Sequence, residues 1–234
     1  MEKIPANTGI DWIRQGFAIF RKQPAELAML FLLYMLLMFV LSLIPVVGQL
    51  LPLLLVPTFS VAFMQACVEI EADRKVRPDL LLTAFRSPAL GTLLRLGVLY
   101  LLAAILAVAA STIVDDGVFW KLMSGQLRAD EQNIPVANLP LAMMFSALIY
   151  VPFAMAFWHA APLAIWQRMG LFKAIFYSFF AVRRCGKAFL AYALGWIVVG
   201  IAVPAIISAL WGLILGKAIV AIMLLMPLSV ILTI

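Results

Sequence analysis

Apolar residues fill long blocks of this chain, and most of the charged residues fall between the blocks. The first block, residues 27–68, runs for 42 residues without a charge. A helix crosses the apolar core of a membrane with about 20 residues, so this block is long enough for two crossings. Pro45 and Gly48, near its middle, are typical of a tight turn. The pattern therefore predicts a transmembrane hairpin with helices at about 25–44 and 51–70.

Four more apolar blocks have the length of a membrane span. They lie at about 90–113, 139–166, 188–207 and 217–234. The block at 139–166 is the longest, and it contains three prolines. Because proline removes a helical hydrogen bond, these residues predict a kinked helix. The predicted fold class is an all-α integral membrane protein with about six transmembrane helices.

Short segments with aromatic and basic residues precede the predicted hairpins. In residues 10–23, apolar side chains recur at spacings of three and four, which is typical of a helix lying at the membrane surface. Residues 170–184 form a similar segment, and residues 78–87 a third, which we expect to be a short helix. Each interfacial helix and the hairpin after it make one predicted repeat unit. The units are residues 1–76, 77–168 and 169–234.

Two landmarks in the sequence support the three units. Residues 16–24 align without a gap with residues 178–186, and residues 84–86 form a looser third copy. Each returning span also contains an apolar residue followed by proline, at Pro57, Pro152 and Pro227. We therefore expect the units to pack with approximate threefold pseudosymmetry.

The third unit ends differently from the other two. After Pro227 the sequence stops at Ile234, whereas the first two units continue to basic residues. A charged carboxylate close to hydrocarbon is costly. The pattern favours a truncated third unit, or a last helix that stops short of the membrane surface.

The composition agrees with a membrane protein and indicates its orientation. Hydrophobic residues make up 66% of the chain and charged residues 12%, which excludes an ordinary soluble domain. The net charge is +6, but the basic residues lie in short connections and form no domain that could hold nucleic acid. Of the 17 lysines and arginines, 14 lie before residue 27, at 74–95 or at 168–187. The positive-inside rule then predicts that both termini are cytoplasmic.

Several motifs in the first hundred residues resemble a known family. They are Trp12-x-x-x-Gly16-Phe17-x-x-Phe20-Arg21-x-x-Pro24, the turn Ile44-Pro45-x-x-Gly48, Pro57 with Cys67 ten residues on, and Ala84-Phe85-Arg86. This set is similar to an uncharacterised family of bacterial polytopic inner-membrane proteins. The repeated plan is also distantly similar to the membrane domain found beside some glycerophosphodiester phosphodiesterases. The resemblance implies a fold and a bacterial inner membrane, and it transfers no catalytic residue.

Two polar residues occupy nearly equivalent places in the first two units. Gln65 follows Phe63 by two residues, and His159 follows Phe157 in the same way. Polar side chains inside a membrane are expensive unless they are paired. Gln65 and His159 are therefore candidates for an intramembrane polar site that binds a solute, relays protons or lines a path. The alternative is that each forms a hydrogen bond to a neighbouring helix and serves packing alone.

Two basic clusters next to aromatic residues are candidates for contacts with anionic lipid headgroups. They consist of Arg21 and Lys22 in the first segment, and of Arg183, Arg184 and Lys187 in the last. The same residues also serve as the signal for membrane orientation, and the sequence leaves both interpretations open.

Motifs of enzymes are absent from the sequence. It has no Gly-x-Ser-x-Gly, His-Glu-x-x-His or Walker motif, and its single histidine cannot supply a site with several histidine ligands. We expect no enzyme activity, no metal and no cofactor. The leading hypothesis is a scaffold or accessory protein in envelope or lipid organisation. The alternative is a small transporter or channel for an apolar or lipid-like solute. Membrane lipids are the expected partners, and a homo-oligomer is compatible with the sequence.

Overall fold

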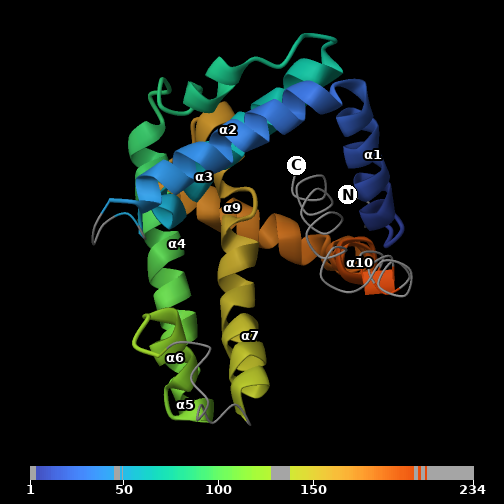
Figure 1. Ribbon diagram of the computed structural model, residues 1–234. Helices are drawn as coiled ribbons and strands as arrows, with labels where there is room; N and C mark the ends of the chain where they lie inside the picture. Colours follow the sequence, from blue (N-terminus) through green and yellow to red (C-terminus); the bar gives the residue numbers. More distant parts are fainter. Residues whose placement is uncertain are drawn as a thin grey trace. The chain divides into compact units, whose positions relative to one another are not determined.

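The computed structural model describes residues 4–44, 48, 50–127, 138–202, 205–206 and 209 of the 234-residue chain. Every regular element among these residues is a helix (Figure 1). Packing divides the chain into two compact units. Unit one consists of Met1–Val40, Val61–Thr83 and Val182–Ile234, and unit two consists of Leu41–Ser60 and Ala84–Ala181. This division follows packing and does not test the threefold repeat, which stays a prediction.

Unit one contains the N-terminal helices and a late helix of the chain. Its elements are α1 (Thr8–Lys22), α2 (Pro24–Ser42), the last part of α3 (Leu51–Glu71), the 3-10 helix η1 (Pro78–Leu82), α10 (Gly186–Ile197) and the π-helical turn η3 (Val198–Ala202). The buried residues of α2, Leu27, Leu30, Phe31 and Met38, lie on one face because they recur at helical spacings. Phe31 and Tyr34 of α2 pack against Phe63 of α3, with 5.5 Å between the Tyr34 and Phe63 ring centroids.

Unit two contains the central part of the chain. Its elements are the first part of α3, then α4 (Leu90–Ala110), α5 (Thr112–Asp115), α6 (Val118–Met123), α7 (Leu139–Phe157), α8 (Ala160–Trp166) and most of α9 (Leu171–Arg184). A Cβ atom on Gly97 of α4 would lie 2.8 Å from the carbonyl carbon of Leu54. Glycine at this position therefore allows α3 and α4 to approach closely. Tyr100 of α4 stacks on Phe157 of α7 with ring centroids 4.6 Å apart.

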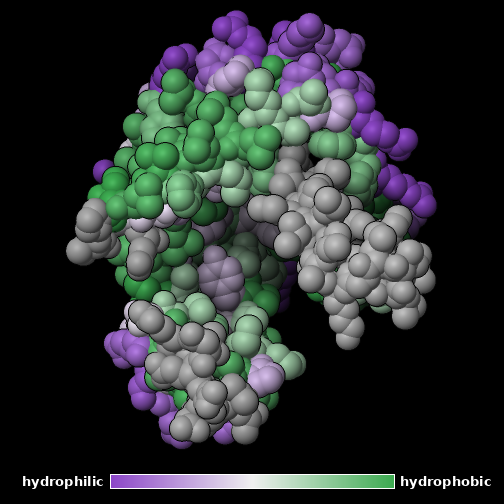
Figure 2. All heavy atoms as spheres, viewed as in Figure 1, coloured by the Kyte–Doolittle hydropathy of each residue, from purple (hydrophilic) through white to green (hydrophobic). Residues whose placement is uncertain are grey.

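Four stretches of helix have the length and hydropathy of membrane spans. They are Pro24–Ser42, Leu51–Glu71, Leu90–Asp115 and Leu139–Trp166, and Leu171–Arg184 with Gly186–Ala202 passes the same test only as one broken span. On α2, Leu32, Leu36 and Phe39 are 57%, 58% and 63% exposed. Figure 2 shows this apolar surface along α2. A helix with large apolar side chains on its open face suits lipid, so the all-α membrane fold is confirmed.

The predicted positions of the first four spans are confirmed to within a few residues. The fifth, predicted at 188–207, begins as α10 and continues into the π-helical turn η3. The predicted sixth span and the turn at Pro45 lie outside the described residues. The structure therefore bears on four or five of the six predicted spans.

The helix of the fourth span is interrupted near its end, and the position of the interruption has a local cause. Helix α7 ends at Phe157 and α8 starts at Ala160, so the break includes Trp158 and His159. Pro162 has no N–H to donate to the carbonyl of Trp158, and its ring clashes with that carbonyl in a regular helix. Of the three prolines in this span, Pro162 is the one with the break one turn before it.

The short helix predicted at 78–87 is wrong in its length. The structure has the 3-10 helix η1 at Pro78–Leu82, followed by turns. The helix ends at Leu82, five residues before the two local effects that act at the end of the predicted segment. Proline disfavours helical backbone at Ser87, the residue before Pro88. The Ser87 hydroxyl also accepts a hydrogen bond from the N–H of Ala89 at 3.1 Å, which competes with a helical bond.

Candidate functional site

Gln65, the candidate polar residue of unit one, is bonded within its own helix. Its side-chain amide donates a hydrogen bond of 2.9 Å to a carboxylate oxygen of Glu69, one turn further along α3. The other carboxylate oxygen of Glu69 accepts a hydrogen bond from the guanidinium of Arg74 and forms an ion pair with it. This carboxylate raises the pKa of Arg74 above its ordinary value. The Gln65 amide is thus connected to the charged end of α3.

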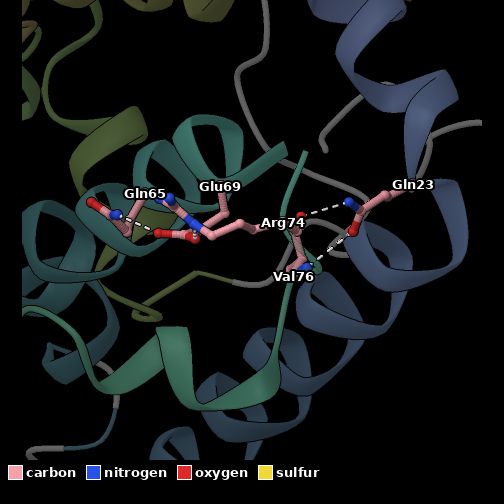
Figure 3. A network of polar contacts seen from close by, with 5 residues as sticks. All are labelled: Gln23, Gln65, Glu69, Arg74 and Val76. Carbon is pink, nitrogen blue, oxygen red and sulfur yellow. Dashed lines mark hydrogen bonds and ion pairs between the residues drawn. The ribbon is translucent and has the colours of Figure 1, made fainter. Parts of the chain in front are cut away.

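Gln23 joins the same network from the junction of α1 and α2 (Figure 3). Its amide nitrogen donates to the carbonyl of Arg74 at 2.7 Å, and its amide oxygen accepts from the N–H of Val76 at 3.0 Å. Next to it, the Lys22 ammonium lies 3.7 Å from the carboxylate of Asp73. One side chain therefore holds two backbone groups of the segment that follows α3. These bonds fix the α1–α2 junction to the end of the first hairpin.

The role of Gln23 was not predicted from the sequence. The signal available was its position: Gln23 stands between the last residue of α1 and the proline that starts α2. Its backbone angles, φ −143° and ψ 65°, are not helical, so it separates the two helices. A polar side chain at such a junction can bond to whatever backbone lies beside it. Which backbone that is depends on tertiary packing, so the partner was not predictable from spacing.

Helix α1 packs along α10 through small and aromatic residues. A Cβ atom on Gly9 would lie 2.7 Å from the backbone nitrogen of Tyr192, so only glycine fits there. The Trp12 ring lies edge-on to Phe189 at 5.2 Å, and Phe17 lies 6.5 Å from Trp196. Later residues of α1 thus contact later residues of α10.

An apolar cavity of about 190 Å³ lies within unit one. Most of its wall comes from α1, with Leu27 from α2, Cys67 from α3, and Tyr192 and Trp196 from α10. The residues of α1 that line it are Trp12, Ile13, Gly16, Phe17, Ile19 and Phe20. The indole nitrogen of Trp196 is buried and has no hydrogen-bond acceptor among the described residues. The cavity therefore has mostly apolar walls, and the indole nitrogen of one lining residue is buried away from water.

The five basic candidate residues lie in two groups on unit one, and all are exposed. Arg21 and Lys22 form the C-terminal end of α1, directly after the cavity-lining Phe20. Arg183 and Arg184 end α9, and Lys187 lies in the first turn of α10. The start of α10 contacts the start of α1, at Ala188 and Gly9. The two groups are thus at opposite ends of the α1–α10 contact, and they do not form one patch.

His159, the candidate polar residue of unit two, lies in the break between α7 and α8. Its backbone N–H donates to the hydroxyl of Ser178 at 2.9 Å, and that hydroxyl donates to the carbonyl of Met155 at 3.0 Å. Ser178, on α9, is fully buried. In an unbroken helix the His159 N–H would bond directly to the Met155 carbonyl. The serine hydroxyl is inserted into this bond and satisfies both groups.

Gln65 and His159 therefore have separate surroundings in separate units, each with identified hydrogen bonds. Sequence reasoning did not identify Ser178, although its alignment with Gly16 marked it as the first residue of a repeated segment. Among the described residues, no three histidine, cysteine, aspartate or glutamate side chains gather as metal ligands would. The adjacent acids Asp115 and Asp116 do not form a pair there either: Asp115 accepts the N–H groups of Gly117 and Phe119 at the start of α6.

A comparison with curated proteins finds a relative that extends over nearly the whole chain. A probable inner membrane protein of Burkholderia thailandensis is 37% identical over 237 aligned positions, which cover 99% of this chain and 87% of the relative. No protein-family model matches the chain. No solved structure matches it either.

Proposed function

Because this chain belongs to the same family as the probable inner membrane protein of Burkholderia thailandensis, we propose that it is a non-enzymatic protein of a bacterial inner membrane. In this proposal it is a scaffold or accessory in the organisation of lipids or of the cell envelope. The proposed lipid-binding surface consists of amphipathic helices that hold anionic lipid headgroups.

The observation that carries the proposal is the way α1 is held. Helix α1 has an apolar face and ends in Arg21 and Lys22. Gln23 bonds its end to the segment after α3, and the aromatic residues of α1 pack on α10. A helix held in this way presents its basic end at a fixed place, which reduces the entropy lost when a headgroup binds. Each basic residue near an anionic membrane surface contributes about 1 kcal/mol to the attraction.

The proposed orientation places both termini and the basic connections in the cytoplasm. It rests on the distribution of lysine and arginine, because cytoplasmic loops are enriched in these residues. Reporter domains fused after Arg74 and Arg168 are expected to be cytoplasmic, and one fused after Gln126 is expected on the outer side. The reverse pattern would overturn the orientation, and with it the assignment of the basic clusters to the cytoplasmic leaflet.

The lipid role is tested by measuring which lipids the protein selects. Spin-labelled phosphatidylglycerol and phosphatidylcholine are compared in membranes that contain the reconstituted protein, and the immobilised fraction of each is recorded. The expected result is a preference for phosphatidylglycerol that decreases in Arg183→Gln/Arg184→Gln and at high salt. Lys121→Gln, which removes an exposed charge from the predicted outer side, is the control. No preference for phosphatidylglycerol in the wild type would remove the basis of the proposal.

A small transporter or channel for an apolar or lipid-like solute is the second candidate. The break in the fourth span favours it, because discontinuous helices frequently form the substrate sites of transporters. Flux of a candidate solute through liposomes that contain Gln65→Leu or His159→Leu, compared with the wild type, tests this function. Unchanged flux in both variants would count against a path lined by these residues.

A further inference from the structure

We propose that the cavity of unit one binds one acyl chain of an anionic phospholipid, whose phosphate group lies against Arg21. This inference rests on the proposed lipid-binding function and identifies one site and one ligand class for it. The site is built from α1, α2, α3 and α10.

The size of the cavity suits part of a hydrocarbon chain. Its volume is about 190 Å³. An engineered apolar cavity of about 150 Å³ stays dry and binds benzene, so this volume holds an apolar group of about six to eight carbon atoms. Most of the wall area is apolar, which favours an apolar group over a polar solute. A whole lipid does not fit, but one segment of an acyl chain does.

The charge at the end of α1 favours an anionic headgroup. Arg21 lies four residues after the cavity-lining Phe17, so the two are neighbours on one side of the helix. Lys22 is partly neutralised by Asp73, whereas Arg21 has no acidic partner within the described part of the chain. An exposed guanidinium beside an apolar cavity matches a phosphate attached to an acyl chain.

The two free cysteines provide an internal test of occupancy. Cys67 lines the cavity, and Cys185, between α9 and α10, does not. The full-length protein is placed in nanodiscs of phosphatidylcholine alone, or with a third of it replaced by phosphatidylglycerol. The rate at which N-ethylmaleimide modifies each thiol is then followed by mass spectrometry. We expect phosphatidylglycerol to slow the modification of Cys67 about tenfold, which corresponds to occupancy of about nine sites in ten. The modification rate of Cys185 should stay the same.

Two variants identify the parts of the site. A Cβ atom on Gly16 meets nothing within 4 Å, so Gly16→Leu is expected to fill the cavity without displacing backbone. Gly91 on α4 has the same open surroundings outside the cavity, and Gly91→Leu is the matched control. The difference in the Cys67 modification rate between the two membranes should disappear in Gly16→Leu and persist in Gly91→Leu. In Arg21→Gln this difference should fall at least severalfold.

Three results would overturn the inference. They are equal Cys67 rates in the two membranes, a lipid effect of the same size on Cys185, and a full lipid effect in Gly16→Leu. If one of them appears while the spin-label preference for phosphatidylglycerol remains, the acyl-chain site is wrong and the proposed function stands. Protection of Cys67 by oleate but not by phosphatidylglycerol would assign the cavity to free fatty acids and would also contradict the proposal.

Discussion

Helices α1 and α9 contain segments that align in sequence, yet the two helices have different structural roles in their units. Both are amphipathic and both end in a basic pair. Gly16 of α1 lines an open cavity, whereas the aligned Ser178 of α9 is fully buried. Its hydroxyl bridges the break in the fourth span. One small residue at the same place in the repeat thus leaves space in one unit and supplies a hydrogen bond in the other.

This comparison shows what two aligned segments share and where they differ. The aromatic and basic residues keep each helix amphipathic, so both helices can lie between membrane and water. The specific role comes from the position that faces the neighbouring helix. Glycine permits close approach or empty space, and serine adds a donor and an acceptor. Substitutions at Gly16 and Ser178, or at the residues that hold these helices in place, test whether this aligned position determines the different roles of α1 and α9.

The largest effect is expected from Gly9→Val, which tests how firmly α1 is held on α10. The added side chain would meet the backbone of Ala188 and Tyr192, and backbone cannot yield as a flexible side chain does. Overpacking of this kind costs about 1–3 kcal/mol or more. The midpoint of unfolding in sodium dodecyl sulfate, followed by circular dichroism, should shift to a lower detergent concentration. Gly16→Val on the same helix, where a Cβ meets nothing, should not lose stability; an equal loss in both would refute the packing argument.

The next effect is expected from Ser178→Ala in unit two. The change leaves the N–H of His159 and the carbonyl of Met155 without their shared partner. Leaving a buried donor unsatisfied costs about 1–3 kcal/mol, so the free energy of unfolding should fall by an amount in this range. Ser60→Ala is the control, because the Ser60 hydroxyl bonds only the Pro57 carbonyl of its own helix. The bridging role would be excluded if Ser178→Ala were no more destabilising than Ser60→Ala.

Much of the fold was predictable because it depends on local patterns. Long uncharged blocks gave four membrane-length helices, and the prolines gave the broken fourth span. The end of one element was predicted wrongly: the segment at 78–87 forms only the 3-10 helix Pro78–Leu82, although Pro78 is a good helix start. Local patterns therefore predict that an element exists better than they predict where it ends.

The candidate site was less predictable, because its contacts join distant parts of the chain. Gln65 and His159 were identified as polar residues in a membrane, but only the partner of Gln65 follows from local spacing. Gln65 bonds Glu69, and the backbone of His159 bonds Ser178, which is 19 residues away. Gln23 reaches residues more than fifty positions further along. Spacing along a helix cannot reveal such pairs, whereas the intrahelical pair Gln65 and Glu69 follows the ordinary i,i+4 rule.

A smaller effect is expected from Gln23→Leu, which removes the bonds that hold the end of α1. Two hydrogen bonds to backbone are lost, and the site is partly exposed, so the cost should be about 1 kcal/mol. Hydrogen exchange at the Val76 amide should become faster. Gln23→Glu keeps an acceptor for Val76 and loses the donor to Arg74, so it should leave the Val76 amide more protected than Gln23→Leu does. Equal exchange in the two variants would contradict the assigned bonds.

The smallest effect on stability is expected from Gly16→Ser, which gives α1 the residue of α9. Serine favours helix over glycine by a few tenths of a kcal/mol, and its hydroxyl can bond a carbonyl of the preceding turn. A Cβ at this position meets nothing within 4 Å, so the free energy of unfolding should change by less than about 0.5 kcal/mol. A large loss of stability, measured by the same detergent titration, would mean that α1 requires glycine here for packing. If stability is kept, α1 tolerates the serine that in α9 bridges the break between α7 and α8. The different roles of the two helices then come from the neighbouring elements, because no interrupted helix lies beside Gly16 in the described part of unit one.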